Sequence, residues 1–257
     1  YGLRLNPKID DLVKNHLRFA DYLIALTKGI KKEFTKIGMP LKKIKEINYG
    51  IDEKIYYIKD SKSKIRKSLN IAENKFVYFC CGRNHPKKNF KILILAAIEL
   101  KKKYKDFIIM ITGKNTQKLN LLIKKNNLEN YFILNDEVPY LDKDFKFPNK
   151  KLLSHFKASD AFVFPSNLET FGIVLIEAMA CNLPIITSNA EGCVDVIENG
   201  KFGLIFNRND SKELASKMIK IRNNKTKLKY ISKSKERIKD FALTSIIKEY
   251  RKLILND

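Results

Sequence analysis

Four short, continuous apolar runs, separated by segments of helical periodicity, restrict this chain to one class of fold. The runs are FVYFCC at residues 76–81, FIIMI at 107–111, AFVF at 161–164 and PIIT at 184–187. A strand that is apolar at every position is buried on both faces, which is typical of parallel sheets covered by helices. The pattern therefore predicts an α/β fold: a Rossmann-like open parallel sheet with flanking helices.

The remaining elements follow from periodicity and capping signals. Thr27 is placed to cap a helix that Gly38 ends, and apolar residues at helical spacing indicate a helix over residues 90–103. Residues 53–75 are polar and lysine-rich, which predicts a linker with one or two helical turns. Residues 12–19 are amphipathic. We further expect helices at 28–37, 116–126, 150–158, 172–180, 211–222, 231–241 and 243–253, a helical turn at 194–198, and strands at 21–26, 44–47, 131–134 and 204–206.

The charge of the chain is large and unevenly distributed. The sequence holds 51 Lys and Arg against 28 Asp and Glu, a formal net charge of +23, which favours a polyanionic partner such as nucleic acid or a membrane surface. Most of the basic residues are lysine, which is less directional than the arginine that reads bases. In contrast, residues 160–200 contain no basic residue but six acids: Asp160, Glu169, Glu177, Glu191, Asp195 and Glu198. Burial alone does not explain a segment that excludes lysine and keeps acids.

Composition excludes several other classes of protein. A hydrophobic fraction of 44% suits a packed core, and no apolar run approaches the roughly 18 residues of a spanning helix. Four cysteines without C-x-x-C spacing indicate reduced thiols and a cytoplasmic location: Cys80, Cys81, Cys181 and Cys193. The first residue is Tyr rather than Met and no signal peptide is recognisable, so we expect a fragment. The three histidines are too scattered for a metal site.

Two loops at the predicted carboxyl ends of strands carry candidate site residues, because ligands of open α/β sheets bind there. In the first loop, Gly82 permits a sharp exit from the strand, and Arg83 and Lys88 precede a helix. A guanidinium, an ammonium and free helix N–H groups at one point suit a phosphate or diphosphate. Because lysine is abundant throughout the chain, Lys88 alone is weak evidence.

The second loop, at residues 165–172, places two carboxylates around a helix start. Glu169 lies in the loop, Gly172 allows close approach of a ligand, and Glu177 interrupts an otherwise apolar helix. With no cation in that segment, a semi-buried Glu177 is expected to meet a ligand hydroxyl or a donor N–H. The alternatives are capping of the helix by Glu169 and a solvent-facing position for Glu177.

The segment 160–187, DAFVFPSNLETFGIVLIEAMACNLPIIT, resembles the donor-site signature of retaining glycosyltransferases of family 4, the group 1 type with the GT-B fold. That signature is a strand, Pro-Ser, E-x7-E and small-x-P. GRNHPKK at 82–88 is similar to the family's G-R-x-x-x-x-K segment, and NYGID at 48–52 to its hinge. DVIENG at 195–200 is similar to a further loop, with Asp195 in place of the usual Glu.

The resemblance implies catalytic roles for Glu169, Arg83 and Lys88. Arg83 and Lys88 would neutralise the diphosphate of a nucleotide-sugar, Glu169 would bind sugar hydroxyls, and Glu177 would accept hydrogen bonds from the ribose. The donor-binding set implied is Gly82, Arg83, Lys88, Glu169, Thr170, Phe171, Gly172, Ile173 and Glu177. The family is metal-independent, so no metal and no cofactor is expected; the nucleotide-diphosphate-sugar is a co-substrate.

The resemblance also implies a domain organisation. Residues 1–52 would be the remnant of a truncated N-terminal acceptor domain and 53–75 a linker. Residues 76–235 would be the C-terminal nucleotide-sugar-binding domain, the C-terminal half of a GT-B enzyme. Residues 236–257 would form a helix that packs back toward the N-terminal domain.

We therefore expect a hexosyltransferase that acts on a glycan or lipid-linked acceptor in polysaccharide or lipopolysaccharide biosynthesis. Its lysine-rich tail suggests peripheral contact with an anionic membrane. Two alternatives stay open: a non-catalytic nucleotide-sugar-binding module, and a basic nucleic-acid-binding α/β domain. The second lacks an aromatic-interleaved basic strand, so no nucleic-acid partner is expected. Asp142-Lys143-Asp144 matches a D-x-D metal motif, but it lies in a lysine-rich loop where such triplets arise by chance.

Overall fold

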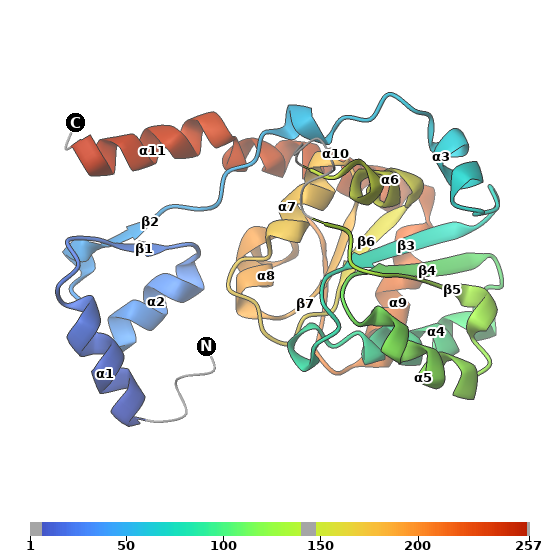
Figure 1. The fold of residues 1–257 in the computed structure, drawn as a ribbon, viewed down its shortest axis with the longest axis horizontal. Coiled ribbons are helices and arrows are strands. Elements are labelled where there is room, and N and C mark those ends of the chain that lie inside the picture. The colour runs from blue at the N-terminus through green and yellow to red at the C-terminus, as the bar shows by residue number, and fades with distance from the viewer. Residues whose placement is uncertain (1–6, 140–147, 256–257) are drawn as a thin grey trace.

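The computed structural model of the protein describes residues 7–139 and 148–255. The strands form a parallel sheet of six, in the order β5-β4-β3-β6-β7-β8, and a separate pair, β1-β2. Figure 1 shows the pair apart from the large sheet. The strands of the large sheet are β3 (Phe76–Cys81), β4 (Phe107–Thr112), β5 (Phe132–Asn135), β6 (Ala161–Phe164), β7 (Ile185–Ser188) and β8 (Leu204–Phe206). The predicted Rossmann-like parallel sheet is therefore confirmed.

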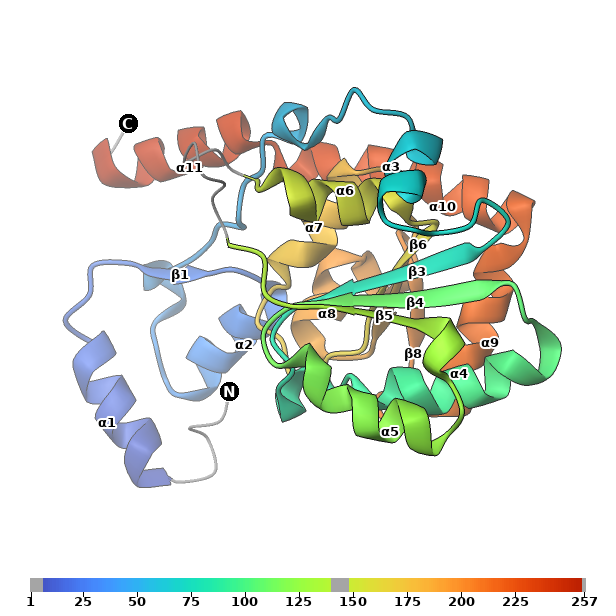
Figure 2. The ribbon, with the colours of Figure 1, turned by 45° about the vertical axis from the view of Figure 1, so that its right-hand side comes forward.

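Helices cover both faces of this sheet (Figure 2). They are α3 (Lys62–Ser68), α4 (Lys91–Lys103), α5 (Asn120–Lys125), α6 (Lys150–Ala158), α7 (Ile173–Ala180), α8 (Glu191–Val196), α9 (Ser211–Arg222) and α10 (Asn224–Arg237). Alternate residues of β3 point into two different cores, as a pleated strand requires. Val77 and Phe79 pack in one core with residues of α6, α7 and α8, whereas Tyr78 and Cys80 pack in the other with residues of α4, α5 and α9. This explains why the strand is apolar at every position.

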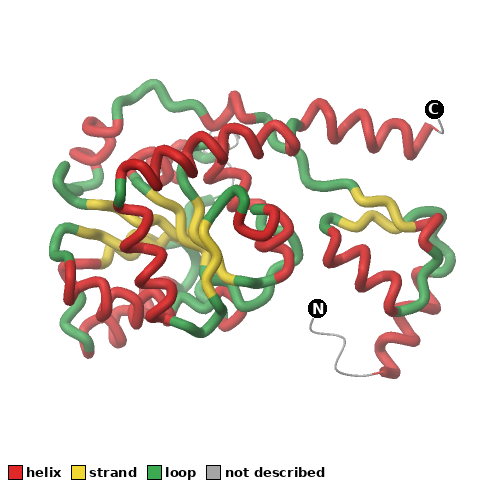
Figure 3. The backbone as a smooth tube through the Cα atoms, turned by 180° about the vertical axis from the view of Figure 1, so that it is seen from behind, coloured by secondary structure: helices red, strands yellow, loops and turns green. Residues whose placement is uncertain are grey.

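The N-terminal segment forms a small body of its own. It comprises α1 (Pro7–Leu17), β1 (Leu23–Ala25), α2 (Lys28–Lys36) and β2 (Ile44–Glu46), with a separate core around Leu23, Ala25, Met39 and Ile44. Figures 1 and 3 show this body to one side of the large sheet, with the final helix α11 (Leu243–Leu255) reaching toward it. Thr27 caps α2 as predicted, because its Oγ1 accepts a hydrogen bond from Ile30 N at 3.3 Å.

The chain runs between these two bodies twice, and the two connecting segments are hydrogen-bonded to each other at one point. Ile51 N donates to Phe241 O at 2.7 Å, and Leu243 N donates back to Ile51 O at 3.0 Å. Gly50 allows this approach, since a Cβ built there would lie 3.0 Å from Leu243 Cα. We refer to this pairing of Ile51 with residues 241–243 as the crossover.

Several predicted boundaries were wrong where polar residues conceal the helical period. The helix α10 begins at Asn224, seven residues before the expected start, because Asn223 caps it by accepting a hydrogen bond from Thr226 N at 3.1 Å. The helix expected at 116–126 divides into a 3-10 turn, η4 (Thr116–Leu119), and α5. The turn expected at 194–198 begins earlier, as the helix α8.

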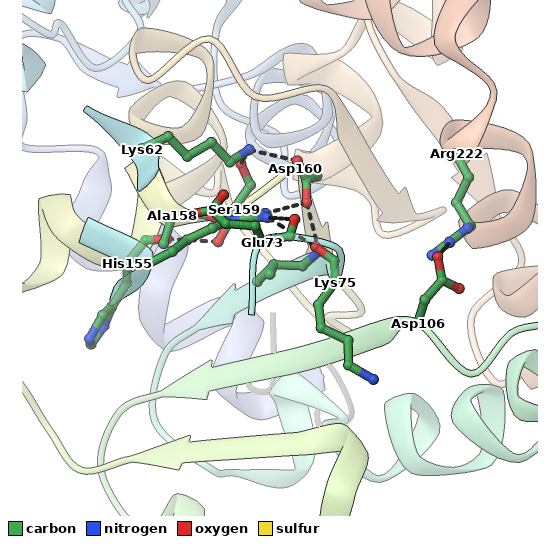
Figure 4. Close-up of polar contacts among 11 residues, drawn as sticks. Lys62, Glu73, Lys75, Asp106, His155, Ala158, Ser159, Asp160 and Arg222 are labelled. Carbon is green, nitrogen blue, oxygen red and sulfur yellow. Dashed lines mark hydrogen bonds and ion pairs between the residues drawn. The ribbon is translucent and has the colours of Figure 1, made fainter. Parts of the chain in front are cut away.

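Residues 53–75 contain a short 3-10 turn, η2 (Glu53–Tyr56), and the helix α3, which a buried ion-pair network fixes to the sheet (Figure 4). Arg66 Nη2 and Lys62 Nζ each lie 2.6 Å from an oxygen of Asp160. The same carboxylate accepts a hydrogen bond from Val77 N at 2.8 Å, and Arg66 Nε donates to Ala158 O at 2.9 Å. Asp160, one of the six acids in the lysine-free segment, therefore has a structural role at the starts of β3 and β6.

Candidate functional site

The strand order of the large sheet reverses between β3 and β6, which is where open α/β sheets form a ligand crevice. The loop after β3 and the loop after β6 meet at this point. Lys87 O accepts hydrogen bonds from Asn167 N at 2.7 Å and from Ser166 Oγ at 2.9 Å. The structure thus brings together the two loops that the sequence singled out.

A hollow of about 600 Å³ opens beside the two loops, a size that suits a small-molecule ligand. Of the predicted site residues, Arg83, Lys88, Glu169 and Thr170 line it. The complete lining is Arg83, His85, Lys87, Lys88, Lys114, Glu137, Leu168, Glu169 and Thr170. Because basic residues outnumber acids around one concave surface, the hollow favours an anionic ligand.

Lys88 and Glu169 form an ion pair across the hollow. Lys88 Nζ lies 2.5 Å from Glu169 Oε2 and 4.7 Å from the centre of the Phe164 ring. The other oxygen of Glu169 accepts a hydrogen bond from the adjacent Thr170 N at 3.1 Å. No side chain caps α7, so the expectation that Glu169 is only a helix cap is not supported. Both charged groups are held in place before any ligand binds.

Arg83 differs from Lys88 in its surroundings. Its side chain is exposed, and within residues 7–139 and 148–255 no hydrogen bond or ion pair involves it. Gly82, with φ at +140°, makes the sharp exit that the sequence predicted and so directs the chain from β3 into this loop. The guanidinium of Arg83 lines the hollow and is therefore available to an anionic ligand.

The start of α7 forms the other side of the crevice. Gly172 has φ at +88° and supplies no side-chain cap, which leaves the first N–H groups of an eight-residue helix available to an anion. Phe171 is buried between Tyr49 and Phe241, with ring centroids 5.4 and 5.6 Å away. The side chain of Phe171 therefore supports the crossover and does not line the hollow. Ile173 is exposed and also lies outside the lining.

Glu177 is 4% exposed, so the alternative of a solvent-facing position was wrong. Tyr56 Oη donates a hydrogen bond to Glu177 Oε1 at 3.0 Å. Burial raises the pKa of Glu177, and the hydrogen bond from Tyr56 partly opposes that rise. The partner of this carboxylate is thus a protein hydroxyl. Glu177 and Gly82 do not line the hollow, and their predicted contacts with a donor stay predictions.

Asp195, whose role the sequence left undefined, contacts the N-terminal body. Its Oδ2 accepts a hydrogen bond from Gly29 N, at the start of α2, at 2.8 Å. On the same helix α8, Gly192 N donates to Glu169 O at 3.3 Å. The helix α8 therefore connects the start of α2 to the loop that carries Glu169 and Thr170.

The sequence argument missed six residues of this region: His85, Lys87, Lys114, Glu137 and Leu168, which line the hollow, and Tyr56, which contacts Glu177. Lys114 and Glu137 follow β4 and β5, so their position at the carboxyl ends of parallel strands was the available signal. Tyr56 lay in the predicted linker. The D-x-D triplet Asp142-Lys143-Asp144 lies outside the described residues, and among those described no group of three or more His, Cys, Asp or Glu residues could hold a metal ion.

Comparison with known proteins identifies the family. The model of a family described as "Glycosyl transferases group 1" matches residues 61–238. The chain belongs to the group 1 glycosyltransferases. This match includes both loops of the hollow, α7 and Asp195, and it confirms the resemblance that the motifs indicated.

Relatives of this group 1 glycosyltransferase include N-acetyl-alpha-D-glucosaminyl L-malate synthase of Bacillus anthracis, 23% identical over 84% of the chain and 54% of that protein. Alpha-monoglucosyldiacylglycerol synthase of Acholeplasma laidlawii is 30% identical over 79% of the chain and 48% of that protein. The chain thus spans about half the length of these curated relatives.

Among solved structures, Anabaena Alr3699/HepE in complex with UDP and glucose superposes with a TM-score of 0.84 at 22% identity, over 98% of this chain and 68% of that one. The fold is therefore that of the C-terminal part of GT-B glycosyltransferases, as expected. Within the described residues of this group 1 glycosyltransferase, no helix is both long and apolar enough to cross a membrane.

Proposed function

We propose that the protein transfers a hexose-type sugar from a UDP-sugar donor to a glycan or lipid-linked acceptor, with retention of anomeric configuration and without a metal ion. The observation that carries this proposal is the hollow at the point where the strand order reverses. In this hollow the Lys88–Glu169 ion pair lies beside Arg83, which has no partner among the described residues. Glu169 belongs to the loop that leads into α7, a helix whose first turn has no side-chain cap. Among similar structures, Anabaena Alr3699/HepE is in complex with UDP-glucose.

The residue types of the hollow suit the chemistry of glycosyl transfer. The bond between the anomeric carbon and the diphosphate oxygen breaks, and the diphosphate leaves with the electron pair. The oxygen of an acceptor hydroxyl bonds to the anomeric carbon, and the proton of that hydroxyl passes to the departing diphosphate. The transition state resembles an oxocarbenium ion while negative charge grows on the diphosphate. Arg83, Lys88 and the first N–H groups of α7 would stabilise that growing charge, because they bring positive charge and N–H donors to one side of the sheet.

Glu169 and Glu177 would orient the two ends of the donor. Glu169 reaches the hollow with its carboxylate fixed by Lys88 and Thr170 N, which suits hydrogen bonds from sugar hydroxyls. Glu177 lies one and a half turns into α7, where a carboxylate would accept hydrogen bonds from the ribose. Residues 1–52 would be the last part of the acceptor domain, and residues 76–235 the donor domain.

Transfer by the full-length protein distinguishes this proposal from the non-catalytic alternative. Calorimetry with UDP-glucose, UDP-N-acetylglucosamine and GDP-mannose should show binding of at least one UDP-sugar, and proton NMR of the product should show the anomeric configuration of the donor. Donor binding without turnover would favour a non-catalytic nucleotide-sugar-binding module. Binding of none of the three donors would contradict the proposal.

Peripheral contact with an anionic membrane is a second, separable part of the proposal. In the tail, residues 210–252 contain 14 basic and 5 acidic residues. On α11, Leu243, Ile247 and Ile254 are exposed beside Lys248 and Arg251. An amphipathic, basic helix of this kind binds anionic lipid surfaces, which would place the enzyme at the cytoplasmic face of the membrane. We expect the protein to co-sediment with anionic but not with neutral liposomes. Equal co-sedimentation with both would contradict the proposed contact with an anionic membrane.

A further inference from the structure

Glu177 is the one acid of α7, and its surroundings offer little to an ionised carboxylate. The other buried residues of α7 belong to an apolar core, and the thiols of Cys81 and Cys181 are close enough for the charge of Glu177 to raise their pKa further. Burial raises the pKa of these thiols and keeps them neutral. The charge of Lys157 lowers the pKa of Cys181 slightly against the effect of burial, but no described cation pairs with Glu177. A buried carboxylate without a cation needs hydrogen bonds to stay ionised.

Tyr56 supplies that hydrogen bond from a segment far away in the sequence. Its hydroxyl donates to Glu177 Oε1 at 3.0 Å, and its ring, 6% exposed, belongs to the core that α7 helps to form. No described residue donates a hydrogen bond to the second oxygen, Oε2. The tyrosine therefore occupies one carboxylate oxygen and leaves the other for a further donor, such as a ligand hydroxyl.

The backbone that carries Tyr56 is tied to the crossover. Tyr56 ends η2, which begins directly after Asp52, whose Oδ1 accepts a hydrogen bond from Lys54 N at 3.1 Å. One residue earlier, Ile51 forms the backbone hydrogen bonds of the crossover. The five residues 52–56 thus link the point where the two bodies join to the carboxylate of Glu177.

We propose that Tyr56 is a positioning residue of the donor site: its hydroxyl orients the Glu177 carboxylate for a ribose hydroxyl and connects that carboxylate to the crossover. This inference rests on the proposed function, because it takes a nucleoside diphosphate as the ligand. Tyr56 does not touch the reacting atoms; it acts through Glu177. Loss of the Tyr56 hydroxyl therefore changes the protonation and the orientation of the Glu177 carboxylate. It does not alter Arg83 and Lys88, which line the hollow.

The test compares Tyr56→Phe with Tyr57→Phe, a neighbouring tyrosine that is 72% exposed. Loss of the hydroxyl removes a hydrogen bond to the ionised form, so carbon-13 NMR titration should show a higher pKa of Glu177 in Tyr56→Phe and an unchanged one in Tyr57→Phe. The pH below which UDP affinity falls should rise as well, so that UDP binds about tenfold more weakly at a pH in that range. Phenylalanine keeps the ring, so the fold is retained.

Two further measurements isolate the ribose. Wild-type protein should bind UDP more tightly than an analogue whose ribose lacks one hydroxyl, and Tyr56→Phe should reduce that difference. In a Glu177→Gln background, Tyr56→Phe should have no further effect on the pH profile, because glutamine does not titrate.

An unchanged pKa of Glu177 in Tyr56→Phe would overturn the inference. So would a raised pKa with a pH profile of UDP affinity identical to that of Tyr57→Phe; in that case the proposed function stands, since the protein still binds the nucleotide. If wild-type protein binds no UDP or UDP-sugar at any pH, the proposed function fails and this inference fails with it.

Discussion

Lys88 Nζ lies 2.5 Å from Glu169 Oε2, so the cation proposed for the diphosphate and the carboxylate proposed for the sugar are paired with each other. The pair holds both side chains at the hollow, where a sugar diphosphate would insert its phosphate beside Lys88 and its sugar hydroxyls beside Glu169. Arg83, in the same loop as Lys88 and without a partner among the described residues, would supply charge that no internal contact has already neutralised.

Arg83→Ala should therefore weaken donor binding without changing stability. A charge-assisted hydrogen bond contributes about 1.5–3 kcal/mol, so we expect a loss of about ten- to a hundredfold in UDP-glucose affinity by calorimetry and an unchanged thermal midpoint. Lys91→Ala, an exposed cation at the start of α4 that does not line the hollow, is the matched control for overall charge and should change affinity much less. Equal losses in the two variants would show that the hollow attracts the donor only through its net charge.

Asp160→Asn should destabilise the protein more than any change at a surface ion pair. The variant leaves Arg66, 4% exposed, without its charged partner, which costs about 3 kcal/mol in the free energy of unfolding. Asp60→Asn is the control, because Asp60 pairs with Lys64 in solvent and should show no measurable change. Urea denaturation at pH 7 measures both variants, and an Asp160→Asn midpoint equal to the wild type would contradict the role given to the network.

The contribution of Asp160 should also depend on pH. Burial by itself would raise the pKa of Asp160, but the Lys62 and Arg66 charges and the Val77 N–H group outweigh it and hold this pKa below its ordinary value. A lowered native pKa means that the stabilisation is complete above the unfolded-state value of about 3.9 and is lost as the pH falls through the native value. The difference between wild type and Asp160→Asn should therefore shrink below about pH 4. A difference that stays constant down to pH 3 would exclude this carboxylate as the cause.

The strands β3 and β6 were predicted to the residue because burial on both faces leaves continuous apolar runs in the sequence. The pairing of β3 with β6, which the sequence did not predict, brings together the two loops that carry Arg83, Lys88 and Glu169. Local periodicity failed at α10, where lysine and asparagine fill its first turns.

The Tyr56–Glu177 hydrogen bond could not be predicted from the sequence, because it joins residues 121 positions apart. No local pattern specifies such a contact. The same holds for Asp195 and Gly29, which belong to different bodies of the molecule. The sequence located the carboxylates, but their partners depend on how distant segments pack.

Gly192→Ala should displace the loop that carries Glu169. A Cβ at residue 192 would lie 2.5 Å from Thr170 O and 2.7 Å from Glu169 O, distances that real side chains do not occupy. Because these are backbone atoms, the loop itself must shift, and UDP-glucose affinity should fall at least tenfold by calorimetry. Glu191→Ala, an exposed change in the same turn of α8, should bind normally. Normal binding by Gly192→Ala would show that the position of this loop does not determine donor affinity.

Asp195→Ala should loosen the contact between the N-terminal body and the donor domain. The carboxylate accepts a hydrogen bond from Gly29 N in the first turn of α2, an interaction comparable to a helix cap of about 1 kcal/mol. Its loss should therefore raise the hydrogen-exchange rate of the first-turn amides of α2 about fivefold, while the amides of β3 stay protected. Asp195→Asn is the matched variant, because its side-chain oxygen can still accept from Gly29 N and should restore most of the protection. Equal exchange at α2 in wild type and Asp195→Ala would show that Thr27 alone holds the start of this helix, and that α8 does not connect the N-terminal body to the donor loop.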